Sequence, residues 1–177
     1  MAIFDRLPKA AQIAAVYAVI VFTVYSWTLL WFFWKYPSWL YFLNLGEILT
    51  VLAYSLATNF FESLLVLAAP LALAVVLPKK WFYETFVARG ITLVLPILGY
   101  MMVLAYQFES KIDYPTEALN WAPVVLAVTL LLVFIVGRVG FLRKALEFFA
   151  DRATIFIYLT IPLSLASVLV VVIRMLT

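Results

Sequence analysis

Residues 47–80, EILTVLAYSLATNFFESLLVLAAPLALAVVLPKK, combine a long apolar run with embedded polar side chains, and they decide how the chain is interpreted. As a helix rising about 1.5 Å per residue, the apolar part alone would be about 45 Å long. The hydrocarbon core of a bilayer is about 30 Å thick and needs roughly 20 residues. The helix is longer than one straight span requires, so we expect the first part of this stretch to extend beyond the hydrocarbon.

Polar residues recur along this stretch at steps of three or four, which places them on neighbouring positions of a helix surface. The predicted polar membrane face consists of Glu47, Tyr54, Thr58, Asn59 and Glu62. A charge at the centre of a span costs about 2.5–3.5 kcal/mol on insertion scales. Measured from Lys79, Glu62 is about 25 Å of helix away, which predicts a position near the outer edge of the hydrocarbon.

The composition excludes a water-soluble globular domain. The chain has 177 residues, of which 68% are hydrophobic and 12% charged, more apolar surface than one soluble core can bury. The apolar runs are continuous and of helix length, whereas a transmembrane barrel would show short alternating segments. We therefore predict an all-α fold, a polytopic transmembrane helical bundle. The loops are too short for a soluble domain, so residues 1–177 form a single transmembrane domain.

The apolar runs predict five spans, at about 10–34, 47–78, 89–107, 121–137 and 153–176. Residues 139–151 have apolar side chains on one face and charged ones on the other, which is typical of a short amphipathic helix in the membrane interface. A six-span alternative divides the long stretch into two helices. It would place Asn44 and Glu47 well inside lipid, which disfavours it.

The end of the first span is unusually aromatic. We interpret these rings as a belt at the membrane surface, continuing into a turn at KYPSW: Tyr25, Trp27, Trp31, Trp34, Tyr36, Trp39 and Tyr41. Near the start of the same span, Ala10, Ala14 and Ala18 place small side chains on successive helical turns. Such a face lets another helix approach closely, and we expect it to be a packing surface.

Basic residues gather in segments that a five-span chain places on one side of the membrane. Seven of them are predicted to be topogenic charges or contacts for anionic lipid headgroups: Lys79, Lys80, Arg89, Arg138, Arg143, Lys144 and Arg152. The positive-inside rule then predicts a cytoplasmic N-terminus and an outer C-terminus. The expected location is the plasma membrane, in a bacterium the inner membrane.

The chain contains no cysteine and no histidine. This excludes disulfides, thiolate or imidazole metal ligands, and nucleophile pairs that depend on histidine. We expect no metal, no other cofactor and no nucleic-acid partner. The expected partners are membrane lipids and either another protein or further copies of this chain.

Three functions remain open from the sequence. In the first, the chain is a membrane-embedded subunit or partner of a larger assembly, packing through the polar face and the alanine face. In the second, Glu62 and Asn59 line a polar cavity in a small transporter or channel. In the third, which we regard as the weakest, Glu47 and Glu62 act with Glu109 and Asp113 on lipid-linked substrates. We expect a chain that is not an enzyme.

Overall fold

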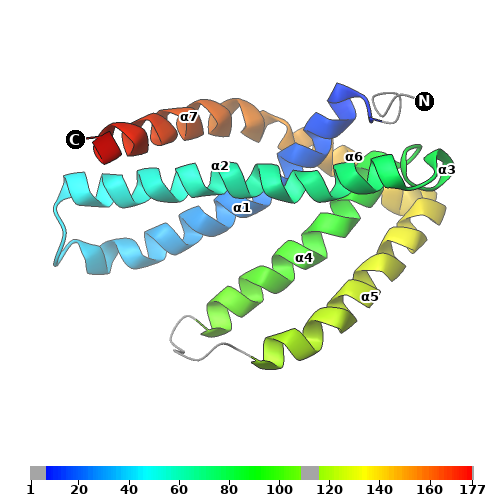
Figure 1. Ribbon diagram of the computed structural model, residues 1–177, viewed down its shortest axis with the longest axis horizontal. Coiled ribbons are helices and arrows are strands. Elements are labelled where there is room, and N and C mark those ends of the chain that lie inside the picture. Colours follow the sequence, from blue (N-terminus) through cyan, green and yellow to red (C-terminus); the bar gives the residue numbers. More distant parts are fainter. Residues whose placement is uncertain (1–6, 109–115, 177) are drawn as a thin grey trace.

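The computed structural model describes residues 7–108 and 116–176. Within these residues the chain forms helices α1 (Ala10–Trp39), α2 (Leu45–Val76), α3 (Lys79–Phe82), α4 (Phe86–Phe108), α5 (Thr116–Arg138), α6 (Gly140–Ala153) and α7 (Ile155–Leu176) (Figure 1). In this described part, α1, α2, α4, α5 and α7 are the helices long and apolar enough to cross a membrane. The predicted fold class is confirmed, and the chain is a multi-pass helical membrane protein.

Helix α2 is one continuous helix, so the six-span alternative is wrong. Its first turn is closed by a capping box. The backbone N–H of Glu47 donates to Asn44 Oδ1 at 3.0 Å, and the backbone N–H of Asn44 donates to Glu47 Oε2 at 2.8 Å. An Asn cap followed three residues later by Glu satisfies amide groups that have no partner within the helix. These two polar side chains mark the beginning of α2.

The predicted turn at KYPSW is also wrong, because α1 continues through Pro37 to Trp39 and the chain reverses at residues 40–44. Each long helix tolerates one internal proline: Pro37, Pro70, Pro96, Pro123 and Pro162. Proline is more frequent in membrane helices than in soluble ones, since neighbouring groups can satisfy the carbonyl that it frees. Proline was therefore a poor signal for the end of this helix.

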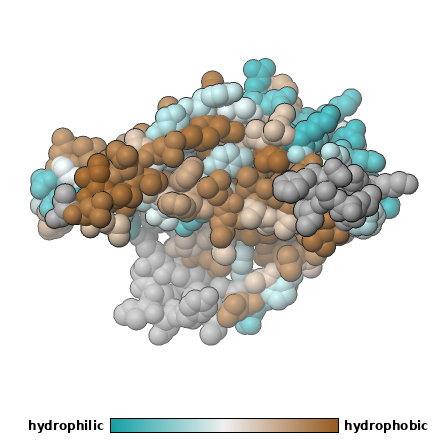
Figure 2. Space-filling model, turned by 45° about the horizontal axis from the view of Figure 1, so that its top comes forward, coloured by the Kyte–Doolittle hydropathy of each residue, from teal (hydrophilic) through white to brown (hydrophobic). Residues whose placement is uncertain are grey.

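The molecule has two ends that differ in composition. We call the end where α1 meets α2 the aromatic end, and the end that holds α3 and α6 the basic end. Helix α1 begins at the basic end, and α7 finishes at the aromatic end beside the start of α2 (Figure 1). Figure 2 shows hydrophilic atoms gathered toward the basic end and a largely hydrophobic surface along the body of the molecule.

Helix α1 is the centre of the bundle, packing against α2, α4, α6 and α7. Its side chains Val16 and Ile20 are fully buried, together with Leu56 of α2 and Phe86 of α4. Gly90 of α4 lies at this junction: a Cβ there would stand 3.2 Å from Val16 Cγ2 and 3.6 Å from Pro70 Cβ. The absence of a side chain lets α4 approach α1 and α2 closely near the basic end.

The long helices form two groups. Helices α1, α2 and α7 lie alongside one another, and we call them the packed half. Helix α5 packs along α4, and we call these two helices the α4–α5 arm. Helix α5 also packs against α6. Toward the aromatic end, the α4–α5 arm diverges from α1 and α2 (Figure 1). The arm therefore meets the packed half mainly at the basic end.

Helix α6 confirms the predicted amphipathic helix. Ala150 and Ala153 are buried, and the helix packs on α1 and α4. Phe141 and Phe148 are 79% and 63% exposed on a helix that also carries charged residues. Exposed aromatic rings beside charges are expected where a helix lies in the headgroup region. This helix connects the two groups at the basic end.

Candidate functional site

The structure separates the residues of the predicted polar membrane face from one another. Asn59 is only 4% exposed and points into the packed half. Tyr54, Thr58 and Glu62, spaced four residues apart, form an exposed line on the neighbouring surface of α2. Glu47 is exposed at the start of the helix, where it forms the capping box. The five residues therefore serve three different environments.

The inward-facing polar groups form hydrogen bonds between helices. Thr28 Oγ1 donates to Asn59 Oδ1 at 3.0 Å, joining α1 to α2. Tyr17 OH and Ser63 Oγ, 3.2 Å apart, join the same helices nearer the basic end. Such pairs are worth about 0.6 kcal/mol on average in membranes, and up to about 1.7 kcal/mol. They account for most of the inner polar atoms of α2, although Asn59 Nδ2 is buried without a partner among the described residues.

One prediction for α1 needs correction. Tyr25 is not part of a surface belt: it is 4% exposed, and its hydroxyl lies 2.5 Å from Ser164 Oγ of α7. The small-residue face is divided along the helix, since Ala18 is fully buried, Ala14 is half-buried and Ala10 is exposed. Its inner part therefore packs within the bundle, and its first turn is exposed.

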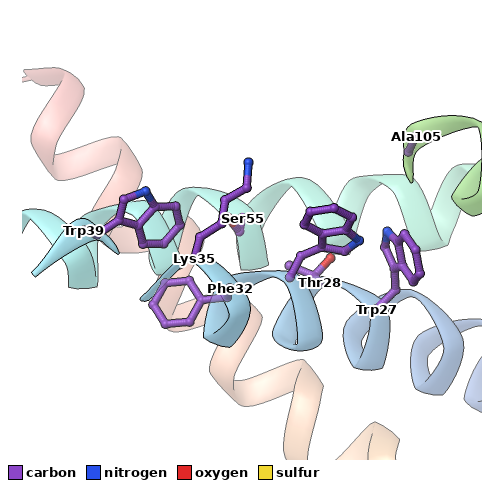
Figure 3. Close-up of a pocket in the computed structure, with 8 residues that line it drawn as sticks. Trp27, Thr28, Phe32, Lys35, Trp39, Ser55 and Ala105 are labelled. Carbon is purple, nitrogen blue, oxygen red and sulfur yellow. The ribbon is translucent and has the colours of Figure 1, made fainter. Parts of the chain in front are cut away.

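An open crevice lies between α1, α2 and α4 toward the aromatic end. One part, of about 320 Å³, is lined by Trp27, Thr28, Trp31, Phe32, Lys35, Trp39, Ser55 and Ala105. A second part, of about 250 Å³, shares Trp27, Thr28 and Ala105 and adds Glu62 with apolar residues of α4. We call the two parts together the aromatic-end crevice. Figure 3 shows Lys35 extending from α1 beside Ser55 of α2, with Trp27 near Ala105 of α4.

Glu62 is the acidic residue of this crevice. Its side chain is exposed and lines the part that also contains Leu98, Met101 and Met102 of α4. Met102 is about 9 Å of helix before the end of α4, so Glu62 lies roughly two turns from that end. Its carboxylate has no hydrogen-bond or ion-pair partner within residues 7–108 and 116–176. A carboxylate placed beside thioethers and leucine is costly unless something else satisfies it.

Aromatic rings of α1 line the first part of the aromatic-end crevice. The rings of Trp27 and Trp31 meet edge to face with centroids 5.7 Å apart, and Trp31 also contacts Tyr106 of α4 at 6.0 Å. Lys35 Nζ lies 5.6 Å from the Trp31 ring centroid, within the range of a cation–π contact. The crevice thus combines rigid apolar rings, one ammonium group and one carboxylate.

The basic residues predicted as headgroup contacts lie on α3, α6, the start of α4 and the end of α5. The guanidinium of Arg138 stacks 4.3 Å from the Phe134 ring centroid, and that of Arg152 stacks 5.2 Å from the Phe148 ring centroid. Arg143 and Lys144 lie on α6, and Arg89 lies in the first turn of α4. Lys79 and Lys80 begin α3, but their side chains are outside the described residues.

The remaining predictions concern metals and catalysis. Among the described residues, no group of three or more acidic side chains is placed to hold a metal ion. Glu109 and Asp113, invoked for an enzyme, lie outside the described residues, and Glu47 is engaged in the capping box of α2.

Comparisons of the chain with models of known families, with curated proteins and with solved structures find no match. The interpretation of the aromatic-end crevice therefore rests on its own geometry.

Proposed function

We propose that the chain is a membrane-embedded subunit or partner of a larger assembly, and that its aromatic-end crevice receives a transmembrane helix of a partner protein. The observation that carries this proposal is Glu62, an exposed carboxylate within a spanning helix that no described residue pairs with. In this arrangement the partner helix supplies a hydrogen-bond donor or a cation to Glu62. Polar contacts of this kind hold membrane helices together, because lipid offers no alternative partner.

The shape and lining of the crevice support a helix as its occupant. The crevice is bounded by α1, α2 and α4, in the region where the α4–α5 arm diverges from the packed half (Figure 1). Trp27 and Trp31 provide large, rigid contact surfaces, the residue type that most often dominates binding energy at protein interfaces. Glu62, the last residue of the exposed line with Tyr54 and Thr58, lines the second part of the crevice.

The geometry favours a subunit over a transporter. A transporter of the predicted kind needs Glu62 and Asn59 in one polar cavity, yet Asn59 is 4% exposed and lines neither part of the crevice, whereas Glu62 lines its second part. Both described parts of the crevice are lined mainly by apolar and aromatic side chains. We further propose, from the positive-inside rule, that the basic end is cytoplasmic.

The test is replacement of Glu62 by Gln, followed by mild detergent extraction and quantification of the proteins that copurify. Losing one charge-assisted interaction of about 1.5 kcal/mol should lower partner recovery by about tenfold. The thermal midpoint of the isolated chain should stay unchanged, because the Glu62 carboxylate has no hydrogen-bond or ion-pair partner within residues 7–108 and 116–176. The matched control is Asp151→Asn on the exposed face of α6, which removes one charge at the basic end. Equal recovery from the Glu62→Gln variant and the original chain would refute the proposal.

A further inference from the structure

A second cavity, of about 420 Å³, lies at the basic end between α2, α3, α4 and α5. Its walls are almost entirely apolar and include Leu73, Phe82, Leu93, Leu130 and Val133. The volume falls within the range of pockets that hold small ligands, which are typically apolar with one or a few polar groups that fix orientation. We call it the basic-end cavity.

Arg89 is the charged residue that lines this cavity. It lies in the first turn of α4, where the partial positive charge of a helix N-terminus disfavours a cation. Its Nε is buried without a hydrogen-bond partner among the described residues, and so is Thr85 Oγ1 one turn earlier. The acidic neighbour that acts on it electrostatically, Glu84, is exposed and forms no ion pair with it. Arg89 thus presents a positive charge and a buried, unpartnered N–H donor at an apolar cavity.

Gly137 of α5 makes room for this guanidinium. A Cβ at Gly137 would overlap the Nη2, Nε and Cζ atoms of Arg89, so a larger residue would displace the side chain. At the rim, Arg138 stacks on Phe134, a second cation beside the cavity wall. Trp81, 58% exposed, also lines the cavity, and tryptophan is enriched at the level of lipid headgroups. The cavity therefore joins an apolar interior to two cations, Arg89 in its wall and Arg138 beside Phe134.

We propose that the basic-end cavity binds one anionic phospholipid from the adjacent leaflet, with an acyl chain among the leucines and the phosphate on Arg89. A guanidinium can donate two parallel N–H bonds to phosphate oxygens, which selects phosphate over other acceptors. Basic pockets between transmembrane helices are recognised sites for anionic headgroups. The site is separate from the aromatic-end crevice, so it stands or fails independently of the proposed subunit role.

The experiment uses the purified full chain, stripped of lipid and titrated in detergent with dioleoyl phosphatidylglycerol or dioleoyl phosphatidylcholine. Native mass spectrometry measures the fraction of chain with one lipid bound. The expected result is tighter binding of phosphatidylglycerol, and an Arg89→Gln variant that binds it about tenfold more weakly. The matched control Lys9→Gln removes an equal charge from an exposed position just before α1 and should bind like the original chain.

A second pair of variants keeps every charge. Gly137→Ala should displace the Arg89 guanidinium and weaken phosphatidylglycerol binding several-fold, whereas Gly140→Ala, with no atom within 4 Å of the added Cβ, should not. This pair decides the question if Arg89→Gln fails to fold. Equal binding of the two lipids by the original chain would overturn the proposal. So would unchanged phosphatidylglycerol binding by Gly137→Ala.

Discussion

Helices α7 and α4 both pack on the central helix α1, but they are held in different ways. Helix α7 is hydrogen-bonded to two neighbours. Near its middle, Ser164 bonds Tyr25 of α1, and near its end, Arg174 donates to Thr50 of α2. Helix α4 packs closely on α1 through Gly90 at the basic end. Toward the aromatic end it borders a crevice, where Trp31 and Tyr106 still bring a ring of each helix into contact. Polar pairs spaced along a helix keep it alongside its neighbours, whereas close packing at one end lets the other end diverge. The crevice is a consequence of this difference.

The largest effect is expected where the arm joins the packed half. Gly90→Leu would force side-chain atoms into Val16 and Pro70, and such overpacking costs typically about 1–3 kcal/mol. We expect a loss of unfolding free energy near the upper end of that range, measured by denaturant unfolding in detergent. The matched control is Gly99→Leu on the same helix, where nothing lies within 4 Å of an added Cβ. Similar losses from the two variants would show that Gly90 is not the junction.

A smaller effect is expected in the packed half. Tyr25→Phe removes the hydroxyl that bonds Ser164, and should cost about 1 kcal/mol of unfolding free energy. Tyr158→Phe, on an exposed position of α7, should cost nothing measurable. A double-mutant cycle with Ser164→Ala isolates the pair, and additive losses would mean that this bond does not hold α7 to α1.

The sequence was sufficient for the features that depend on hydrophobic patterning. The five long helices and the amphipathic α6 follow from the length and periodicity of the apolar runs. These runs are informative because a segment in lipid must satisfy its own backbone polar groups, which favours a helix. The start of α2 carries a signal that the predicted bounds of 47–78 did not use, since Asn44 followed by Glu47 is the pattern of a capping box. The turn expected at Pro37 was wrong because a proline near the end of a membrane helix need not terminate it.

The contacts between helices could not be predicted from the sequence. Tyr17 and Ser63 are 46 residues apart, and Tyr25 and Ser164 are 139 residues apart, so their pairing depends on how the helices pack. The same is true of Arg89 and Gly137, whose proximity is invisible in the chain order. The step of four residues did identify the exposed line that includes Glu62, but the burial of its neighbour Asn59 needed the position of α1.

The most direct test of the subunit role is a photo-activated cross-linker placed at Met102, which lines the crevice beside Glu62. The control carries the cross-linker at Leu169, 62% exposed on the outer face of α7. The account predicts one protein product of defined mass from Met102 in native membranes, none from Leu169, and loss of that product when Glu62 is replaced by Gln. Cross-links to lipid alone at Met102, or a protein product that survives Glu62→Gln, would contradict it.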